Sequence, residues 1–348
     1  MKRNPTGSLP ERLAAFVRTL KRRRLDVALV SGPANVKALT GVDCDNACLV
    51  CRPDGDVRFL TDFRYVPMVH RVAPGLRVRD IRRLTIDGRR VGYEGSVSHA
   101  RFLELRKLAP RATFVDVLPD LKKLRAVKSA DEIARLRAAE RLACEIWETA
   151  AKRFRAGMTE RGMARIIRKL MIDRGDGEAF ETIVCVGPNA AECHHVPDDT
   201  VWNGRDPVLV DMGVKLGGVC SDLTRNLVPK RPRPLYRRVH DLVLKANQAA
   251  IAAARPGLTG RQLDKIARDI IREGGFGRCF GHSLGHGVGY EIHEAPTASK
   301  RDGTVLKPGM LVTVEPGIYL EGNLGVRIED LILITPTGCE VLSHAFRQ

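Results

Sequence analysis

The fold is decided by a segment that occurs twice, as residues 157–175 (GMTERGMARIIRKLMIDRG) and one hundred residues later as residues 257–275 (GLTGRQLDKIARDIIREGG), with six of nineteen positions identical. Each copy follows an alanine-rich helical pattern and opens on a threonine suited to cap a helix, Thr159 or Thr259. Each is later followed by two strand patterns. Only two copies exist, whereas solenoids need three or more short units, so the repeat indicates a duplicated half-domain with pseudo-twofold symmetry. Helices before strands in each half predict an α+β layer architecture.

The strands of the first half carry two aspartates. Residues 208–227 predict two strands around a Gly217-Gly218 turn, which brings Asp211 roughly opposite Asp222. Aspartate suits strand interiors poorly unless something there uses it. Two facing carboxylates repel each other, and they are tolerable if one holds a proton or if a cation lies between them.

The strands of the second half carry two glutamates in the corresponding place. Residues 312–319 and 325–333 predict a second strand pair, which brings Glu315 and Glu329 inward by the same logic. The symmetry then places four carboxylates together. So many anions in one sheet core imply divalent cations.

A glycine-rich segment supplies imidazoles. Residues 281–296, GHSLGHGVGYEIHEAP, contain His282, His286 and His293, three of the nine histidines of the chain. The glycines beside His286 predict close backbone approach and positive φ, as on a strained turn that holds a ligand. Oxygen ligands with a single imidazole suit Mn²⁺, Co²⁺, Fe²⁺ or Zn²⁺ in a two-metal site. A further pair, His194-His195, follows a predicted turn.

Together these motifs resemble the metallopeptidases of the pita-bread (creatinase/aminopeptidase) fold, and most closely the Xaa-Pro peptidases, prolidase and aminopeptidase P. The resemblance is carried by Asp211, by Asp222 in Ser-Asp-Leu-Thr-Arg, by Gly-His-Gly-Val-Gly around His286, by Ile-His-Glu at His293, by Glu-Pro-Gly at Glu315 and by Arg-Ile-Glu at Glu329. It is strong over residues 126–345. It is weaker over the first 125 residues, where Gly32-Pro33 and Thr61-Asp62 are similar to the amino-terminal domain of the family.

The resemblance implies a metal ligand set. Asp211 would chelate one ion, Asp222 and Glu329 would bridge both, and His286 and Glu315 would complete the other. The implied cofactors are two divalent ions, Mn²⁺ or Co²⁺ in preference to Zn²⁺ or Fe²⁺. A water or hydroxide between the ions is the implied nucleophile.

The resemblance also implies catalytic and substrate-binding roles. Glu315 would act as general base and proton shuttle, and Arg327 would orient the carboxylates. His194, His282 and His293 would donate hydrogen bonds to the tetrahedral intermediate, with His194 and His293 also binding substrate. The implied substrate is a peptide or dipeptide with proline in second position, and the implied assembly is a homodimer.

Two positions depart from the family pattern. Cys193 occupies the place of a proline before the substrate histidine, and we favour His194 over His195 as that histidine. Thr297 stands where many dipeptidases have an arginine that binds the free carboxylate of a dipeptide. The choice between dipeptidase and aminopeptidase therefore stays open.

The first 125 residues predict a separate α/β domain, followed by a catalytic domain over residues 126–348. A helical pattern over residues 11–24 leads into a buried strand, and residues 47–60 have the form of a hairpin with Asp-Gly in its turn. Near the boundary, Ser129 and Glu132 predict the capping box of a long helix.

Composition limits the class of partner. The formal charge is +17, but residues 1–128 hold 27 Lys and Arg against 13 Asp and Glu, so most of the excess belongs to one region. Only 5% of residues are aromatic. Because proteins that bind single-stranded nucleic acid need aromatic side chains for base stacking, a solvated basic face is favoured over nucleic-acid binding.

No apolar run approaches the length of a membrane-spanning helix. Nine cysteines in a chain too long to need a disulfide scaffold favour a reduced compartment, hence the cytoplasm.

Three cysteines pose an alternative metal site. Cys44, Cys48 and Cys51 have the spacing of a radical iron–sulfur centre. Cys48 and Cys51 fall in an apolar strand pattern, where odd spacing points them to opposite faces, so we favour a structural interpretation.

Two other functions of the protein also stay open. One is a creatinase-like hydrolase or lyase acting on a non-peptide substrate, and the other is a non-catalytic peptide- or protein-binding module.

Overall fold

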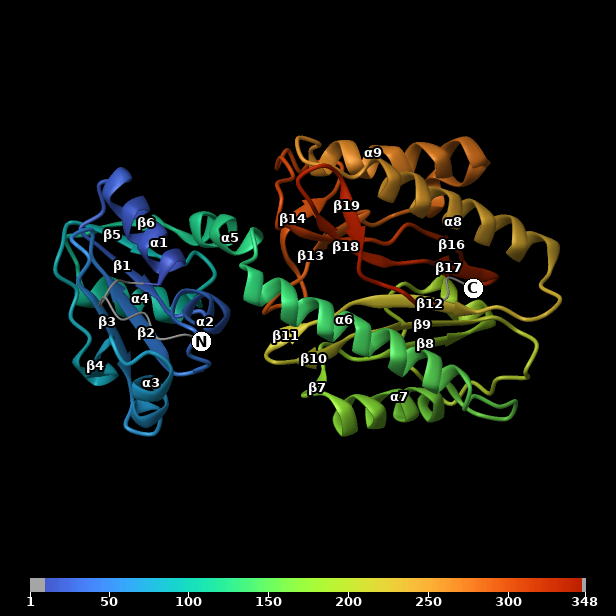
Figure 1. The fold of residues 1–348 in the computed structure, drawn as a ribbon, viewed down its shortest axis with the longest axis horizontal. Helices are drawn as coiled ribbons and strands as arrows, with labels where there is room; N and C mark the ends of the chain where they lie inside the picture. Colours follow the sequence, from blue (N-terminus) through green and yellow to red (C-terminus); the bar gives the residue numbers. More distant parts are fainter. Residues whose placement is uncertain (1–9, 346–348) are drawn as a thin grey trace. The chain divides into compact units, whose positions relative to one another are not determined.

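The computed structural model describes residues 10–345, and the chain divides into two compact units, Met1–Arg125 and Ala126–Gln348 (Figure 1). Each unit builds its own hydrophobic core. Within residues 10–345 no helix combines the length and the apolar character needed to cross a membrane.

The first unit is a six-stranded mixed sheet with helices packed on it. Its strands run in the order β4-β3-β2-β1-β5-β6, and β1 pairs antiparallel with β2 but parallel with β5. The predicted hairpin is confirmed as β2 and β3, and both of its cysteines within β2 are buried. The elements are α1 (Glu11–Arg22), β1 (Val27–Val30), α2 (Pro33–Thr40), β2 (Ala47–Cys51), β3 (Val57–Thr61), α3 (Val66–Val72), β4 (Arg77–Asp80), β5 (Arg90–Tyr93), α4 (His99–Leu108), β6 (Thr113–Asp116) and α5 (Leu118–Ala126).

The second unit repeats an order of two helices followed by strands. The first half comprises α6 (Ala130–Ala151), α7 (Glu160–Arg174), β7 (Gly177–Glu178), β8 (Ile183–Val186), β9 (Val208–Met212), β10 (Val214–Leu216), β11 (Val219–Cys220) and β12 (Leu223–Leu227). The second half comprises α8 (Pro234–Ala253), α9 (Gly260–Ile271), β13 (Gly285–Gly287), β14 (Glu294–Ala298), β15 (Leu311–Val314), β16 (Gly317–Leu320), β17 (Leu324–Arg327), β18 (Asp330–Ile334) and β19 (Cys339–Val341). In each half the helix pair packs on the strands of that half (Figure 1). The predicted α+β duplication is confirmed.

Helix starts in the second unit follow the local sequence. The side chains of Thr159 and Thr259 accept hydrogen bonds from the first turns of α7 and α9. Ser129 and Glu132 form the predicted capping box at α6. These caps satisfy backbone N–H groups that a helix end leaves without partners.

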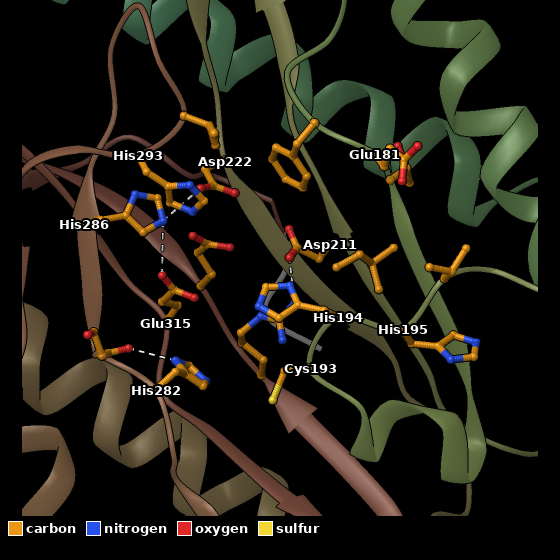
Figure 2. A pocket seen from close by; sticks show the side chains of 18 of the residues that line it. Glu181, Cys193, His194, His195, Asp211, Asp222, His282, His286, His293 and Glu315 are labelled. Carbon is orange, nitrogen blue, oxygen red and sulfur yellow. Dashed lines mark hydrogen bonds and ion pairs between the residues drawn. The ribbon is translucent and has the colours of Figure 1, made fainter. Parts of the chain in front are cut away.

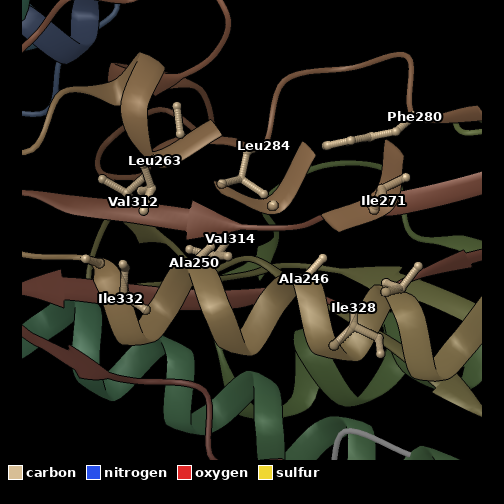
Figure 3. Close-up of a cluster of buried hydrophobic side chains, with 14 of the residues drawn as sticks. Ala246, Ala250, Leu263, Ile271, Phe280, Leu284, Val312, Val314, Ile328 and Ile332 are labelled. Carbon is tan, nitrogen blue, oxygen red and sulfur yellow. The ribbon is translucent and has the colours of Figure 1, made fainter. Parts of the chain in front are cut away.

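The core of the second half lies between α8, α9 and the strands (Figure 3). Ala246 and Ala250 of α8 present small side chains, which lets the helix approach Val312 and Val314 of β15 closely. Leu263 of α9 closes the cluster, and all five side chains are fully buried. Burial of each larger side chain contributes roughly 1.5–3 kcal/mol. This packing holds β15 in place, and β15 leads directly into a predicted site residue.

Candidate metal centre

One cavity of about 460 Å³ in the second unit collects every residue predicted for the site (Figure 2). The carboxylates, histidines and arginine come from strands and loops of both halves. The predicted residues that line it are His194, Asp211, Asp222, His282, His286, His293, Glu315, Arg327 and Glu329.

The two aspartates come from one pair of strands in the first half. Asp211 lies in β9, where Thr224 of β12 is its direct cross-strand partner. Asp222 precedes β12, two residues before Thr224, so it is diagonal to Asp211 rather than opposite. Because side chains alternate along a strand, this spacing still puts both carboxylates on one face. Gly213 permits the close chain approach there, since a Cβ would lie 2.3 Å from the Ser221 carbonyl oxygen.

The two glutamates occupy interruptions in the strands of the second half. Glu315 separates β15 from β16, and Glu329 separates β17 from β18. The predicted strand pair is thus two shorter ladders, β15 with β18 and β16 with β17. Glu329 also joins the halves: its Oε2 accepts a 2.7 Å hydrogen bond from the Thr224 hydroxyl.

His286 lies in β13, with a bulge between it and Gly287. The expectation of positive φ on a turn is wrong, because none of the neighbouring glycines has positive φ and the histidine is in a strand. The close backbone approach that was predicted with it is confirmed. A Cβ at Gly285 would lie 1.8 Å from the Thr313 carbonyl oxygen, and one at Gly287 would lie 2.4 Å from that of Ala295.

The ring of His286 reaches both halves. Its Nε2 lies 3.5 Å from Asp222 Oδ2 and 3.4 Å from Glu315 Oε1. Its Nδ1 lies 3.1 Å from the Gly287 carbonyl oxygen, a contact in which Nδ1 donates, and this leaves a lone pair on Nε2. An imidazole in this tautomer presents its free nitrogen to a cation.

Electrostatics in the cavity favour a cation. Burial, followed by repulsion from the neighbouring carboxylates, raises the pKa of Asp222 and of Glu329 well above the ordinary range. Burial also raises the pKa of Glu315 and lowers that of His286 to about 4. Carboxylates in this state take up protons unless a positive ion compensates their charge.

Two unpaired oxygens fit the same interpretation. Asp211 Oδ1 and Glu329 Oε1 are buried and lack a hydrogen-bond partner within the described part of the chain. Asp222, His286 and Glu329 offer ligand atoms that lie within 4.8 Å of one another. A buried carboxylate oxygen without a donor is costly, and a divalent cation accepts it, so the residues present fit a metal centre.

Arg327 connects the carboxylates of the two halves. Its Nη2 donates to Asp211 Oδ2 at 2.6 Å, and its Nε donates to the Thr224 hydroxyl at 3.0 Å. Because Thr224 in turn donates to Glu329, one guanidinium orients an aspartate and, through a hydroxyl, a glutamate. Its Nη1 donates to Tyr319 Oη at 2.9 Å.

His282 is held by the same network. Its Nδ1 lies 2.8 Å from the Ser283 carbonyl oxygen and its Nε2 lies 2.9 Å from Tyr319 Oη. Nδ1 therefore donates and Nε2 accepts from the tyrosine hydroxyl. Burial lowers the pKa of His282 to about 4, so the ring is neutral. Both ring nitrogens are engaged within the protein.

The other histidines of the site are placed differently. His194 is exposed on the cavity wall, on the side of Asp211, whereas the ring of His195 turns away from the carboxylates (Figure 2). His195 Nε2 instead lies 2.6 Å from Glu160 Oε2. The ring of His293 meets that of His286 edge-on, with centroids 4.4 Å apart.

Comparison with known proteins assigns this centre to a family. The model of metallopeptidase family M24 matches residues 134–336, and the creatinase/prolidase amino-terminal domain matches residues 12–127. The chain belongs to metallopeptidase family M24. It is 34% identical to the Xaa-Pro dipeptidase of Pyrococcus furiosus over 98% of this chain and 99% of that protein.

Solved structures of Xaa-Pro peptidases have the same fold as this chain. Prolidase from Pyrococcus horikoshii superposes with a TM-score of 0.93 at 31% identity, covering 97% of this chain and 99% of that one. The Xaa-Pro dipeptidase from Bacillus anthracis gives 0.90 at 30% identity, with 97% and 98% covered. The predicted pita-bread fold with its smaller amino-terminal domain is confirmed, and the protein is a metallopeptidase.

Sequence reasoning missed three residues of this M24 site. Thr224, Thr313 and Tyr319 position the predicted residues through hydroxyl contacts; Thr313, for example, donates to Glu315 Oε1 at 3.1 Å. The sequence did contain a signal for the two threonines. Thr224 follows Asp222 by two residues and Thr313 precedes Glu315 by two, and residues two apart in a strand point to the same face. Tyr319 had no such signal, since its partners Arg327 and His282 lie on other segments.

Proposed function

We propose that this M24 protein is a dinuclear metal-dependent peptidase that hydrolyses the Xaa-Pro bond at peptide N-termini or in dipeptides. The observation that carries the proposal is the convergence of four buried or half-buried carboxylates and one imidazole on a single cavity. Relatives that share the whole length of the chain are named Xaa-Pro dipeptidase and prolidase, which supports the choice of substrate.

In this proposal the residues that would hold the two divalent ions are Asp211, Asp222, His286, Glu315 and Glu329. Carboxylate oxygens with one imidazole suit divalent first-row metals. When bound, the ions supply Lewis-acid activation of a water molecule and polarisation of the scissile carbonyl.

Glu315 is the residue that moves the proton. Its carboxylate lies beside the His286 ring at 3.4 Å, where it can accept a proton during attack and return it to the departing proline nitrogen. The Thr313 hydroxyl donates to Oε1 of this carboxylate. That contact fixes the rotamer of Glu315 and leaves Oε2 for proton transfer.

The histidines bind substrate and stabilise developing charge. His194 and His293 line the cavity with exposed rings, so they donate to the carbonyl oxygen of the bound peptide as it becomes an oxyanion. Nε2 of His282 accepts from the Tyr319 hydroxyl in the resting protein, so His282 donates from this atom only when Tyr319 releases it and a proton binds there. Arg327 holds Asp211 in place throughout.

The finer assignments are also part of the proposal. We propose Mn²⁺ or Co²⁺ as the working ions, a homodimer, and a cytoplasmic location; nine free thiols support a reducing compartment. Metal analysis tests the ions, light scattering tests the homodimer, and cell fractionation tests the location.

Thr297 bears on the length of the substrate. It lies in β14, and its hydroxyl carries no charge to pair with a peptide carboxylate. This supports activity on Xaa-Pro-Yaa peptides as well as dipeptides.

Hydrolysis of Gly-Pro, Ala-Pro and Ala-Pro-Ala by protein loaded with Mn²⁺ or Co²⁺ tests the function. We expect turnover of at least one proline peptide, with Gly-Ala and Ala-Ala-Ala as matched substrates that lack proline. Absence of turnover with every proline peptide under both metals would overturn the proposal. Equal turnover of the matched substrates would remove the proline specificity.

A further inference from the structure

Glu160 is a buried carboxylate that the proposed chemistry does not use. It begins α7 directly after the capping threonine, and its side chain is fully buried. Its Oε1 accepts hydrogen bonds from the Val186 backbone N–H at 2.6 Å and from Asn189 Nδ2 at 3.0 Å. Its Oε2 accepts from the Asp198 backbone N–H at 3.2 Å. One carboxylate thus ties both ends of the segment 186–198, and its position at a helix N-terminus favours its negative charge.

His195 completes the attachment in the middle of that segment. Its Nε2 lies 2.6 Å from Glu160 Oε2, and its Nδ1 lies 3.2 Å from Glu192 Oε2. Both ring nitrogens face carboxylate oxygens, an arrangement that an imidazolium satisfies by donating from both; Nε2 also lies 3.4 Å from Asn189 Nδ2. Burial works to lower the pKa of His195, and the two carboxylates outweigh burial, so that the pKa is raised.

The neighbouring residue is the candidate substrate histidine. We propose that the Glu160–His195 ion pair is a positioning device that fixes the ring of His194 on the cavity wall beside Asp211. The contacts of the His195 side chain with Glu160 fix the backbone conformation of this loop. The side chain of His194, the preceding residue, is thereby directed into the cavity (Figure 2). The inference rests on the proposed function, because it assigns His194 a substrate contact.

The second half lacks this device. Gly260 stands where α7 has Glu160, in the same turn after the capping threonine. A Cβ at Gly260 would lie 2.1 Å from the Thr297 carbonyl oxygen. In the second half the start of the helix therefore packs directly against the backbone at Thr297. The charged attachment therefore belongs to the first half, which carries His194 next to His195.

Glu160, His195 and Asp198 lie near enough to one another to suggest a third cation instead. The contacts argue against it, because each Glu160 oxygen already accepts from N–H groups. A metal ion would have to displace those donors. The proton-bearing imidazolium fills the same place without displacing any of them.

A double-mutant cycle in the metal-loaded protein tests the inference. We expect His195→Ala to lower kcat/KM for the best proline dipeptide by about 10- to 100-fold, since a shift of roughly 1 Å in a positioned group costs that much. His195→Gln, which keeps an N–H donor for Glu160, should recover part of the loss. Because His195 acts through His194, the double variant with His194→Ala should be no slower than His194→Ala alone.

The control variant is Asp199→Asn. Asp199, the residue directly after this segment, pairs with Arg161 of the same helix at 2.5 Å, but the pair is exposed. We expect wild-type kinetics and two ions per chain in this control. Multiplicative losses in the double variant, or a His195→Ala protein with wild-type kinetics and metal content, would overturn the inference.

A second measurement does not depend on peptide cleavage. In protein labelled with ¹⁵N-histidine, His195 should show two ring N–H signals at neutral pH, and the ring signals of His194 should shift in His195→Ala but not in Asp199→Asn. A single ring N–H signal, or an unmoved His194, overturns the positioning pair even if the protein cleaves no proline peptide. Normal signals in a protein without peptidase activity would instead overturn the proposed function alone.

Discussion

The two halves of the catalytic unit share a backbone plan and differ in side chains. The N–H of Glu160 donates to the Thr200 carbonyl and that of Gly260 donates to the Thr304 carbonyl, both at 3.1 Å. The same correspondence continues along the loops, where Asp198 and Asp302 each accept from a threonine N–H two residues later at 2.7 Å. Duplicated backbone contacts make the scaffold. The side chains that this scaffold carries differ between the halves, as at Glu160 and Gly260.

The proposed metal ligands come from both halves. The first half supplies two aspartates and the second supplies two glutamates and the imidazole. Buried contacts across the halves hold the two sets together, among them Thr224 to Glu329 and the ion pair of Arg225 with Asp330. A half by itself carries too few ligands to enclose a pair of ions.

The largest effect is expected at Asp222, the proposed ligand that lies beside the imidazole of the other half. Asp222→Asn keeps the shape and removes the charge, and kcat should fall by at least ~10³-fold because metal activation is worth several kcal/mol. Without metal, the variant should melt no lower than the wild type, since burial and repulsion raise the pKa of Asp222 and removing that charge relieves both. Kinetics, metal analysis and calorimetry of metal-free protein check this. A lower melting temperature in the metal-free variant would contradict it.

A smaller effect is expected at Arg327, which spans the halves through Asp211 and Thr224. Arg327→Lys retains the charge but cannot hold both partners, because an ammonium group lacks the planar fork of the guanidinium. Such orienting contacts are worth about 10- to 100-fold in activity or metal affinity. Steady-state kinetics and metal titration measure the loss. An unchanged metal affinity together with unchanged kcat would remove the orienting role.

The smallest effect is expected at Gly260, where the halves differ most plainly. Gly260→Ala places a methyl group against the Thr297 carbonyl oxygen, and overpacking of this kind costs about 1–3 kcal/mol. The melting temperature should fall by roughly 2–4 °C per kcal/mol for a domain of this size.

Gly303→Ala is the matched control for that variant. A Cβ there would meet no atom of the described chain within 4 Å, and the melting temperature should stay unchanged. Equal behaviour of the two alanine variants would mean that the second half does not depend on the close approach at Gly260.

Much of the architecture followed from local patterns. The capping residues Ser129, Thr159 and Thr259 predicted helix starts that the structure confirms, because a cap depends only on residues within one turn. Helix α5 was not predicted, since its charged sequence has little apolar periodicity.

Predictions about the site were accurate where side chains alternate along an unbroken strand, and they were wrong where a strand is interrupted. In the first half, the register set at the Gly217-Gly218 turn pairs Asp211 with Thr224, so Asp222 is diagonal to Asp211. In the second half, the predicted strand pair is broken at Glu315 and Glu329 into two ladders. The glycines around His286 proved to serve close packing rather than positive φ. Bulges and interruptions depend on which chain lies opposite, and the pattern of one strand does not contain that information.

The amino-acid sequence by itself determined the duplication, the helix starts and the residue types around the metal centre, since all of these follow from local spacing and ligand chemistry. Only the tertiary structure decided which histidine of the pair at 194 and 195 faces the cavity, and which hydroxyl groups connect Arg327 to the carboxylates. The physical reason is that a side chain's direction in an irregular loop is set by its distant partners. Glu160, on a helix 35 residues before His195, is such a partner.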